Sequence, residues 1–428
     1  MNATALKQRI LNGDYDRLFA TLYGEEQVAA QQARYTEAVD GFVATFGDKD
    51  DLRLFSAPGR TEIGGNHTDH NHGRVLAGSV NLDVIAVVSP RNDSVINVQS
   101  KGYPMDTVDT TDLSARVEEV NKSASLIRGT VARFAQRGYG FGGFDAYTTS
   151  NVLKGSGLSS SAAFEVLIGT ILNHLYSACA VSAVEIAQIA QFAENQYFGK
   201  PSGLMDQMAS SVGGIVTIDF EDTDNPVIES VPFDFAACGY KLCIVDVGGD
   251  HADLTHEYAA VPAEMKAVAG DLGEPYLRGI TMDALLAAMP ALRAAHGDRA
   301  VLRAFHFLRE NECVVKQVAA LKAGDFEEFK RLIIESGHSS FEYLQNVYAA
   351  CDVKEQSMSV ALALSQRLLD GVGAWRVHGG GFGGTTQNFV PADKLDSFIT
   401  VMEAVFGQGH CHVLSIRPYG GICLDTMI

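Results

Sequence analysis

The feature that most constrains this chain is the stretch from Asn151 to Val166, which reads NVLKGSGLSSSAAFEV. Two glycines flank Ser156, so the backbone there can turn sharply and approach a ligand without a Cβ in the way. Three serines then lead directly into 162–176, an almost wholly apolar run of helical length. A glycine turn that enters a buried helix directs free backbone N–H groups and the positive end of the helix dipole at an incoming anion. The stretch therefore predicts a phosphate-binding loop.

Other glycine-rich loops fit this stretch less well. A Walker A loop is excluded because no Lys-Ser/Thr pair follows the second glycine. A flexible connector is the alternative, but a connector would not run straight into a long apolar helix. Serine hydroxyls here can donate to phosphate or offer an oxygen ligand to Mg²⁺. The residues expected to hold phosphate groups are Gly155, Ser156, Gly157, Leu158, Ser159, Ser160 and Ser161.

The charge balance limits which partners the chain can have. With a formal net charge of −19 over 428 residues, we expect no nucleic-acid or anionic membrane surface. A polyanionic ligand must then be held locally, by loop amides and a metal ion. The N-terminal residues lack the apolar core of a signal peptide, and no apolar run is long enough to cross a membrane. Seven cysteines without CxxC spacing fit reduced thiols, so we expect a cytoplasmic protein.

The spacing of apolar residues predicts mixed helices and strands. Helices are expected at 5–46 (two), 123–136, 162–176, from Ser182 onward, around Asp206, over most of 263–345 except a loop near Pro290, and at 393–406; strands are expected at 52–57, 75–90, 95–99, 144–151, 213–219, 240–247, 374–378, 387–390 and 412–416. A polar loop is expected at 60–73, after a Pro58-Gly59 turn. The chain changes from β-rich to helix-rich near residue 215. We therefore expect two domains, an N-terminal α/β domain at 1–214 and a C-terminal α+β domain at 215–428.

Two carboxylates stand out by position. Glu194 lies four residues after Ala190 and eight after Ile186, which places it on the buried face of its helix. A carboxylate there needs a cation. Asp206 follows a Pro-Ser break on a short helix with apolar neighbours, which makes a merely solvated surface aspartate a poor interpretation.

Two further motifs carry polar or glycine-rich chemistry. The segment 66–72, NHTDHNH, has metal-ligand residue types, but consecutive loop ligands without a distant partner motif make a poor Zn²⁺ site. Its mixed donors and acceptors suit a polyhydroxylated ligand. The segment 379–384 matches G-x-G-x-x-G, yet a β-like sequence follows it where a dinucleotide fingerprint requires a helix. We therefore reject NAD binding and expect a tight turn close to the substrate or the phosphate loop.

Three segments resemble, in order and spacing, the three motifs of the GHMP small-molecule kinases: APGRTEIGGNHTDHNHG, GSGLSSSAA and RVHGGGFGG. The likeness is closest to the galactokinase family, whose signature usually reads GRVNLIGEHTDYNGG. Four further segments extend the resemblance over nearly the whole chain: AENQYFGKPSGLMDQ, DHADLTHEY, LFATLYG and IIESGHSSFEYL. It implies a two-domain α+β fold of the GHMP kinase type, with the active site in the cleft between the domains.

The resemblance also implies roles for single residues. Asp206 matches the catalytic carboxylate, Arg60 the cation beside the anomeric hydroxyl, and Ser161 and Glu194 the Mg²⁺ ligands. The positions that match substrate-binding residues are Asn66, His67, Asp69, Gly203, Tyr258 and Gly381. The implied activity is an ATP-dependent sugar 1-kinase, most closely a galactokinase, with Mg²⁺ as cofactor and the sugar and ATP as its small-molecule partners.

The chain departs from the family signature where specificity is expected. The usual glutamate is Asn66, Val-Asn after the arginine is Thr61-Glu62, the tyrosine after the aspartate is His70, one glycine is His72, and Arg74 replaces an apolar residue. The resemblance places the replaced glutamate near C6 of the sugar, and an amide both donates and accepts. A kinase of galacturonate or L-arabinose therefore stays open, as does a non-catalytic sugar sensor. The intact serine run, Glu194 and Asp206 favour an enzyme.

Overall fold

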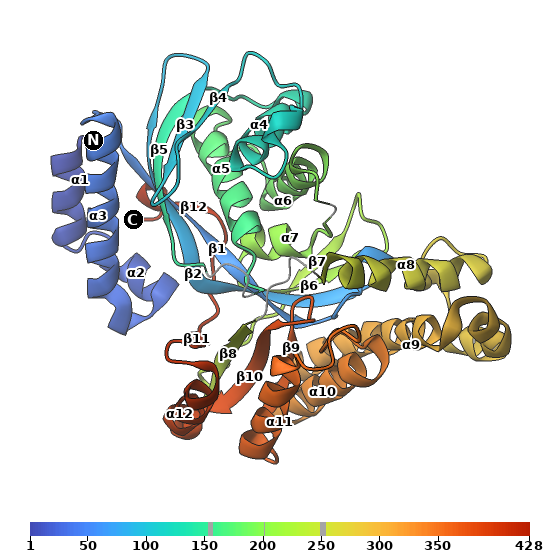
Figure 1. Cartoon of the computed structure of the whole chain (residues 1–428). Coiled ribbons are helices and arrows are strands. Elements are labelled where there is room, and N and C mark those ends of the chain that lie inside the picture. Colours follow the sequence, from blue (N-terminus) through green and yellow to red (C-terminus); the bar gives the residue numbers. More distant parts are fainter. Residues whose placement is uncertain (153–156, 201, 249–253) are drawn as a thin grey trace.

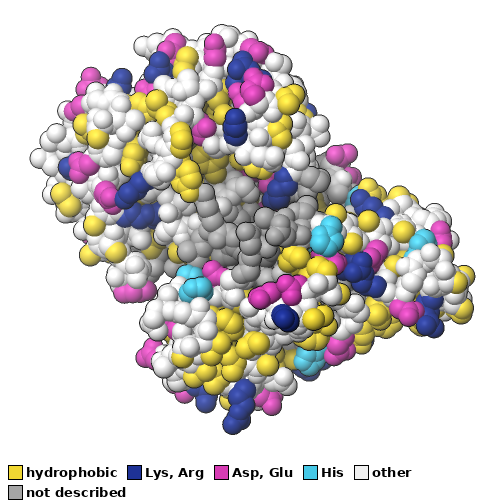
Figure 2. All heavy atoms as spheres, viewed as in Figure 1, with side chains coloured by type: hydrophobic (Ala, Val, Ile, Leu, Met, Phe, Trp, Pro, Cys, Tyr) yellow, Lys and Arg dark blue, Asp and Glu magenta, His cyan; other side chains and the backbone are white. Residues whose placement is uncertain are grey.

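The computed structural model describes residues 1–152, 157–200, 202–248 and 254–428. It is an α+β structure with two sheets, each packed against helices (Figure 1). No helix in the described ranges is long and apolar enough to cross a membrane. On the face shown in Figure 2, Lys and Arg side chains are dispersed among Asp and Glu side chains.

The larger sheet has eight strands in the order β12-β1-β2-β5-β3-β4, with β6 paired to β2 and β7 paired to β6. All pairs are antiparallel except β3 with β5. The strands are β1 Arg53–Gly64, β2 Arg74–Pro90, β3 Val95–Ser100, β4 Asp106–Asp109, β5 Phe144–Ser150, β6 Ile215–Asp219, β7 Val227–Ser230 and β12 Ile422–Cys423. The sheet continues past residue 214 through β6 and β7, and the division into domains at that residue stays a prediction.

Alternation along β2 explains how this sheet lies between two helical layers. Val84, Ala86 and Val88 pack with one layer, whereas Ile85 and Val87 pack with the other, because successive strand side chains point to opposite faces. The first layer consists of α4 Ser123–Gln136, α5 Ser160–Tyr176 and α6 Ala183–Ala193. The second consists of α1 Ala3–Leu11, α2 Asp16–Tyr23 and α3 Val28–Phe46 (Figure 1).

The smaller sheet has four antiparallel strands in the order β11-β8-β10-β9. They are β8 Tyr240–Gly248, β9 Ala374–His378, β10 Gly384–Pro391 and β11 Cys411–Leu414. The remaining helices are α7 Met205–Val212, α8 Thr255–Asp271, α9 Met282–Ala323, α10 Phe326–Ser339, α11 Ser357–Leu369 and α12 Leu395–Phe406. The tight turn between β9 and β10 contains the glycine-rich segment 379–384, as the sequence predicts.

Most predicted elements are confirmed, and three predictions are wrong. β1 does not stop at a Pro58-Gly59 turn but continues to Gly64, with register shifts after Pro58 and Glu62. Proline lacks a ladder donor and is tolerated in a strand at such irregularities. The segment 5–46 forms three helices rather than two. The loop expected near Pro290 is absent, because Pro290 lies inside α9. The backbone of α9 instead departs from helical geometry at Gly297, with φ of 81°.

A buried ionic cluster joins the N-terminal helices to the sheet. Asp83 of β2 is fully buried, and its carboxylate accepts hydrogen bonds from Arg34 at 2.6 Å and Arg417 at 3.0 Å. Tyr23 and Ser56 donate to the same carboxylate. Burial raises the pKa of Asp83, but the two guanidinium charges outweigh it and hold the pKa below its ordinary value. The cluster thereby links the N-terminal helices, through Tyr23 and Arg34, and the C-terminal segment, through Arg417, to β2.

We expect Asp83→Asn to lower the free energy of unfolding by about 3–5 kcal/mol, because it leaves two buried guanidinium groups without their charge partner. Urea unfolding at neutral pH measures this. The surface pair Lys7–Asp40, at 2.6 Å, supplies the control Asp40→Asn, which should change stability far less. The depressed pKa makes the Asp83 contribution complete above its unfolded pKa of about 4, and it is lost as the pH falls through the folded pKa. Equal effects of the two variants would contradict the cluster's role.

Candidate active site

The site is built around the first turn of α5, where the serine run begins the helix. A cavity of about 240 Å³ opens there. Among the described residues its lining consists of Arg60, Gly157, Ser159, Ser160, Ser161, Lys200, Asp206, Tyr258, His378, Gly380, Gly381, Gly383, Gly384 and Thr385. Residues distant in sequence, from the phosphate loop to the glycine turn, thus meet at one cavity. Gly155 and Ser156 lie outside the described residues.

The phosphate loop approaches the glycine turn closely. Gly157 has a φ of 68°, and a Cβ there would lie 3.1 Å from Nδ1 of His378. Ser159 also has positive φ, at 54°, and precedes the helix. Leu158 is fully buried in the core, and its carbonyl accepts from the Arg60 N–H at 3.0 Å. The loop is thus attached to β1 by backbone contact.

Arg60 and Asp206, on β1 and α7, form a close pair. Nε and Nη2 of Arg60 lie 2.7 and 2.6 Å from the same Asp206 oxygen, and Nη1 donates to the Gly157 carbonyl. Burial raises the pKa of Asp206, but the Arg60 charge and hydrogen bonds outweigh it and hold the pKa below its ordinary value. The carboxylate is therefore ionised at neutral pH.

Ser161 and Glu194 also come together. The Ser161 hydroxyl lies 3.3 Å from Oε1 of Glu194, a residue whose side chain is 2% exposed. Gln207 donates to the other carboxylate oxygen at 2.7 Å, and the Lys200 ammonium lies 3.1 Å from Oε1. A hydroxyl and a carboxylate are hard oxygen donors of the kind that Mg²⁺ takes beside phosphate oxygens. The pair therefore fits that ion.

Sequence reasoning missed three polar residues at this place. Glu165 is fully buried, and burial together with the nearby Glu194 raises its pKa well above the ordinary value. Gln207 bridges these two carboxyl groups through one amide nitrogen. The position of Glu165, four residues after Ser161, could have indicated a shared helix face. No sequence pattern points to Lys200.

Two histidines of segment 66–72, His67 and His70, form a chain of hydrogen bonds. His67 Nε2 lies 2.9 Å from the Gly380 carbonyl, and its Nδ1 lies 3.1 Å from Nε2 of His70. Asn71 lies 3.0 Å from the remaining nitrogen of His70. Burial lowers the pKa of His67 to about 4 and that of His70 well below its ordinary value. Both rings are therefore neutral, each with its proton on Nε2.

Three successive carbonyls of the glycine turn are held by side chains. Gly379 accepts from Asn66 at 2.6 Å, Gly380 from His67 and from Asn346, and Gly381 from the Tyr258 hydroxyl at 2.6 Å. Three of these donors are residues expected to bind sugar. A Cβ at Gly381 would come 2.0 Å from the Asn346 carbonyl, so the turn has no room for a side chain there.

Asp69 and Gly203, also expected at the sugar site, lie against each other. A Cβ at Gly203 would come 1.9 Å from an Asp69 carboxylate oxygen. Burial, with the Asp206 charge as the next cause, raises the pKa of Asp69 to about 6. Asn66, His67, Asp69 and Gly203 are not among the residues that line the cavity.

Comparisons with known proteins identify the family. Residues 125–214 match the GHMP kinases N-terminal domain, and residues 40–90 match the galactokinase galactose-binding signature. A galactokinase of Streptomyces coelicolor is 31% identical over 82% of this chain and 88% of its own length. The chain belongs to the galactokinase family. One from Mycobacterium tuberculosis is 33% identical over 85% of this chain and 96% of its own length.

Solved structures show the same fold. Lactococcus lactis galactokinase complexed with galactose has a TM-score of 0.78 at 23% identity and covers 91% of this chain and 99% of its own. Methanococcus jannaschii mevalonate kinase has a TM-score of 0.59 at 13% identity, over 86% and 99%. The chain is therefore a sugar-kinase phosphotransferase of the galactokinase family with the GHMP kinase fold.

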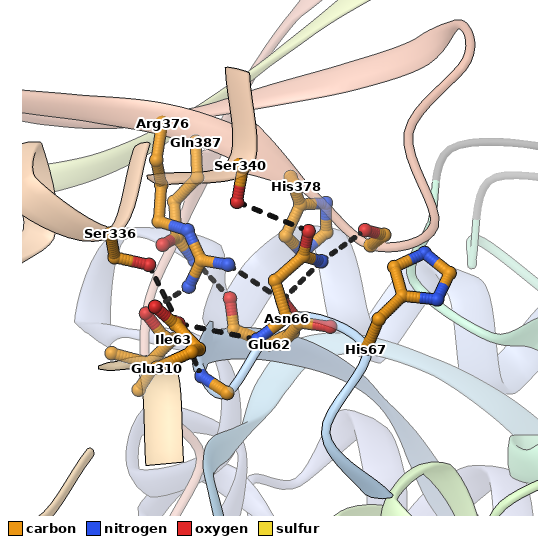
Figure 3. Close-up of polar contacts among 12 residues, drawn as sticks. Glu62, Ile63, Asn66, His67, Glu310, Ser336, Ser340, Arg376, His378 and Gln387 are labelled. Atoms are coloured by element: carbon orange, nitrogen blue, oxygen red, sulfur yellow. Dashed lines mark hydrogen bonds and ion pairs between the residues drawn. The ribbon is translucent and has the colours of Figure 1, made fainter. Parts of the chain in front are cut away.

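Within this galactokinase family member, the departures at 62 and 66 form one exchanged pair. The family's Asn and Glu stand here as Glu62 and Asn66, and the Asn66 amide donates to the Glu62 carboxylate at 2.9 Å (Figure 3). Glu62 also pairs with buried Arg376 at 2.7 Å. Burial raises the pKa of Glu62 to about 7. Compared with the family signature, the carboxylate therefore stands four positions earlier, at 62 instead of 66.

Asn66 itself is fully occupied by the protein. Its amide nitrogen donates to Glu62 and to the Gly379 carbonyl, and its oxygen accepts from Ser340 at 3.3 Å (Figure 3). The oxygen also accepts from Asn346 at 2.8 Å. An amide offers two donor hydrogens and two acceptor lone pairs, and all four are used. With Glu62 in place, position 66 must supply a donor.

We expect Asn66→Glu to destabilise the fold, because it places a second carboxylate against Glu62 and against the Gly379 carbonyl. Glu62→Asn is also destabilising, since it leaves Arg376 without its charge partner. The double variant restores the family's order. It should therefore cost less than the sum of the single variants by about 0.5–3 kcal/mol, as measured by urea unfolding. Strict additivity would show that the two positions are independent.

Proposed function

We propose that this chain transfers a phosphoryl group from ATP to the anomeric hydroxyl of galactose. The observation that supports this most is that Arg60 contacts the Asp206 carboxylate and the Gly157 carbonyl at one cavity. A carboxylate for the acceptor hydroxyl is thereby fixed next to a helix N-terminus suited to phosphate. Phosphoryl transfer needs such positioning and charge neutralisation more than covalent help.

Asp206 and Arg60 would divide the work at the acceptor. In our proposal, ionised Asp206 accepts a hydrogen bond from the sugar hydroxyl, orients its oxygen and takes its proton as the phosphorus–oxygen bond forms. Arg60 stabilises the negative charge that develops on the acceptor oxygen and the transferred group. A carboxylate with a lowered pKa suits a loose transition state, because the proton leaves late and little basicity is required.

The nucleotide is assigned to the phosphate loop. We propose that backbone and hydroxyl groups of 155–161 hold the phosphates of ATP, and that Ser161 and Glu194 hold Mg²⁺. The ion, when bound, would neutralise phosphate charge. The fit of hydroxyl and carboxylate oxygens at 3.3 Å supports this assignment.

The sugar is assigned to the neighbouring motifs. We propose that Asp69 accepts from ring hydroxyls and that His67 and Tyr258 fix the glycine turn, with Gly381, over the sugar. Gly203 would keep Asp69 in place, and Asn66 would border C6 from behind. These residues come from both 1–214 and 215–428, which supports an active site between two domains. We also propose a cytoplasmic location, which the seven free cysteines favour.

A non-catalytic sensor is the weaker alternative. Binding a sugar requires no ionised carboxylate paired with a guanidinium beside a phosphate loop. The Arg60–Asp206 pair, at 2.6 Å, therefore favours the enzyme.

We expect Asp206→Asn to reduce kcat by about 10²–10⁴-fold while galactose and ATP still bind, because the amide keeps the shape but cannot take the proton. ADP release measures turnover, and calorimetry measures binding. Asp234→Asn, at an exposed position outside this cavity, is the control. Turnover near the wild-type value in Asp206→Asn would place the base elsewhere.

The sugar itself is tested by comparing galactose, galacturonate and L-arabinose. We expect kcat/KM for galactose to exceed that for galacturonate by at least about tenfold, because a sugar carboxylate at C6 would approach the Glu62–Asn66 pair. L-arabinose, which lacks C6, should fall between them. A wild-type preference for galacturonate would overturn the galactose assignment and leave a uronate kinase.

A further inference from the structure

Lys200 occupies an unusual position created by a wide helical turn. After α6 the chain forms a π-helical turn at Glu194–Phe198, and the N–H groups of Gly199 and Lys200 both donate to the Glu194 carbonyl, at 3.0 and 3.2 Å. Gly199 takes a φ of 89°. The turn brings Lys200 back over the residue where it began. Such turns are frequent at functional sites.

The ammonium of Lys200 lies near the N-terminus of α5. It is 3.1 Å from Oε1 of Glu194, the same oxygen that the Ser161 hydroxyl contacts at 3.3 Å. Lys200 lines the cavity together with Ser159, Ser160 and Ser161. The helix N-terminus and the ammonium therefore present positive charge to the same space.

Arg60 and Lys200 are the cationic side chains among the described lining residues, and they differ in availability. The Arg60 side chain is 8% exposed and is bound by Asp206 and the Gly157 carbonyl. The Lys200 side chain is 58% exposed. An ammonium has three donor hydrogens, so it can keep Glu194 and still donate to a ligand.

We propose that Lys200 binds the terminal phosphate of ATP, the group that is transferred. This inference rests on the proposed kinase function. In the reaction, the sugar oxygen bonds to the terminal phosphorus, the bond from that phosphorus to the bridging oxygen of ADP breaks, and the hydroxyl proton passes to Asp206. Lys200 stays protonated throughout and neutralises charge on the non-bridging oxygens.

A purely structural role makes a different prediction. Glu194, Glu165 and Asp206 all contribute negative charge near Lys200, and the ammonium could simply neutralise them. Loss of that neutralisation would weaken ATP and ADP by similar factors, because both are anions. Loss of a contact with the terminal phosphate weakens ATP alone. The ratio of the two dissociation constants therefore separates the two roles.

The test measures binding of ATP and of ADP by calorimetry, with Mg²⁺ and with EDTA, in wild type, Lys200→Met and Lys200→Arg. We expect Lys200→Met to weaken ATP by about tenfold or more, as for a lost charge-assisted hydrogen bond, and ADP by less than about twofold. Lys200→Arg should recover most ATP affinity. Lys101→Met removes another paired and exposed lysine, 2.6 Å from Glu37, and should change neither.

The outcomes separate this inference from the proposed function. Equal weakening of ATP and ADP in Lys200→Met, or no weakening, overturns the role of Lys200 while the kinase proposal stands. Failure of the wild type to bind ATP overturns both. Should Lys200→Met unfold, Lys200→Gln provides the same ratio, and full ATP affinity in that variant overturns the inference.

Discussion

The arrangement of the site depends on one guanidinium group. Arg60 projects from β1 and contacts Asp206 at the start of α7 and the Gly157 carbonyl of the phosphate loop. Because these partners belong to separate elements, the guanidinium sets the distance between the carboxylate and the helix N-terminus. Its backbone N–H donates to the Leu158 carbonyl, which attaches the same loop a second time. The planar guanidinium offers its donors in a rigid fork, so it holds both partners in fixed directions.

Three buried carboxylates elsewhere in the fold have charged or polar partners. Glu62 is matched by Arg376, Asp83 by Arg34 and Arg417, and Glu310 by the N–H of Gly65, the Ser336 hydroxyl and the neighbouring His306. Each carboxylate thereby links the first motif or β2 to a segment far away in sequence. An unpaired charge in such surroundings costs several kcal/mol. The exchange of carboxylate and amide between positions 62 and 66 is therefore constrained by Arg376 as much as by any ligand.

Local patterns could predict part of this arrangement, and long-range partners account for the rest. The 3.6-residue period correctly buries Glu194, and the capping box at Ser182 correctly begins α6. Pro58-Gly59 suggests a turn, but the strand continues through it. A single sequence does not reveal the bulged pairing with β2 that keeps Arg60 on a strand. For Asn66 the partners Gly379, Ser340 and Asn346 lie more than 270 residues away. The contact between Lys200 and Glu194 is also not predictable, although the two residues are only six apart in sequence. The π-helical turn that brings them together has no recognisable apolar period.

The hydrogen bonds to the glycine turn have a consequence for ligand exchange. Gly379, Gly380 and Gly381 are gripped by donors that come from the first motif, from α8 and from the segment after α10. The turn can swing away only if these bonds break together, since each fixes a neighbouring carbonyl. We therefore expect the turn to move as one unit. If the sugar lies beneath the turn, as we propose, its exit requires these hydrogen bonds to break, and loss of any one of them should shorten its residence time.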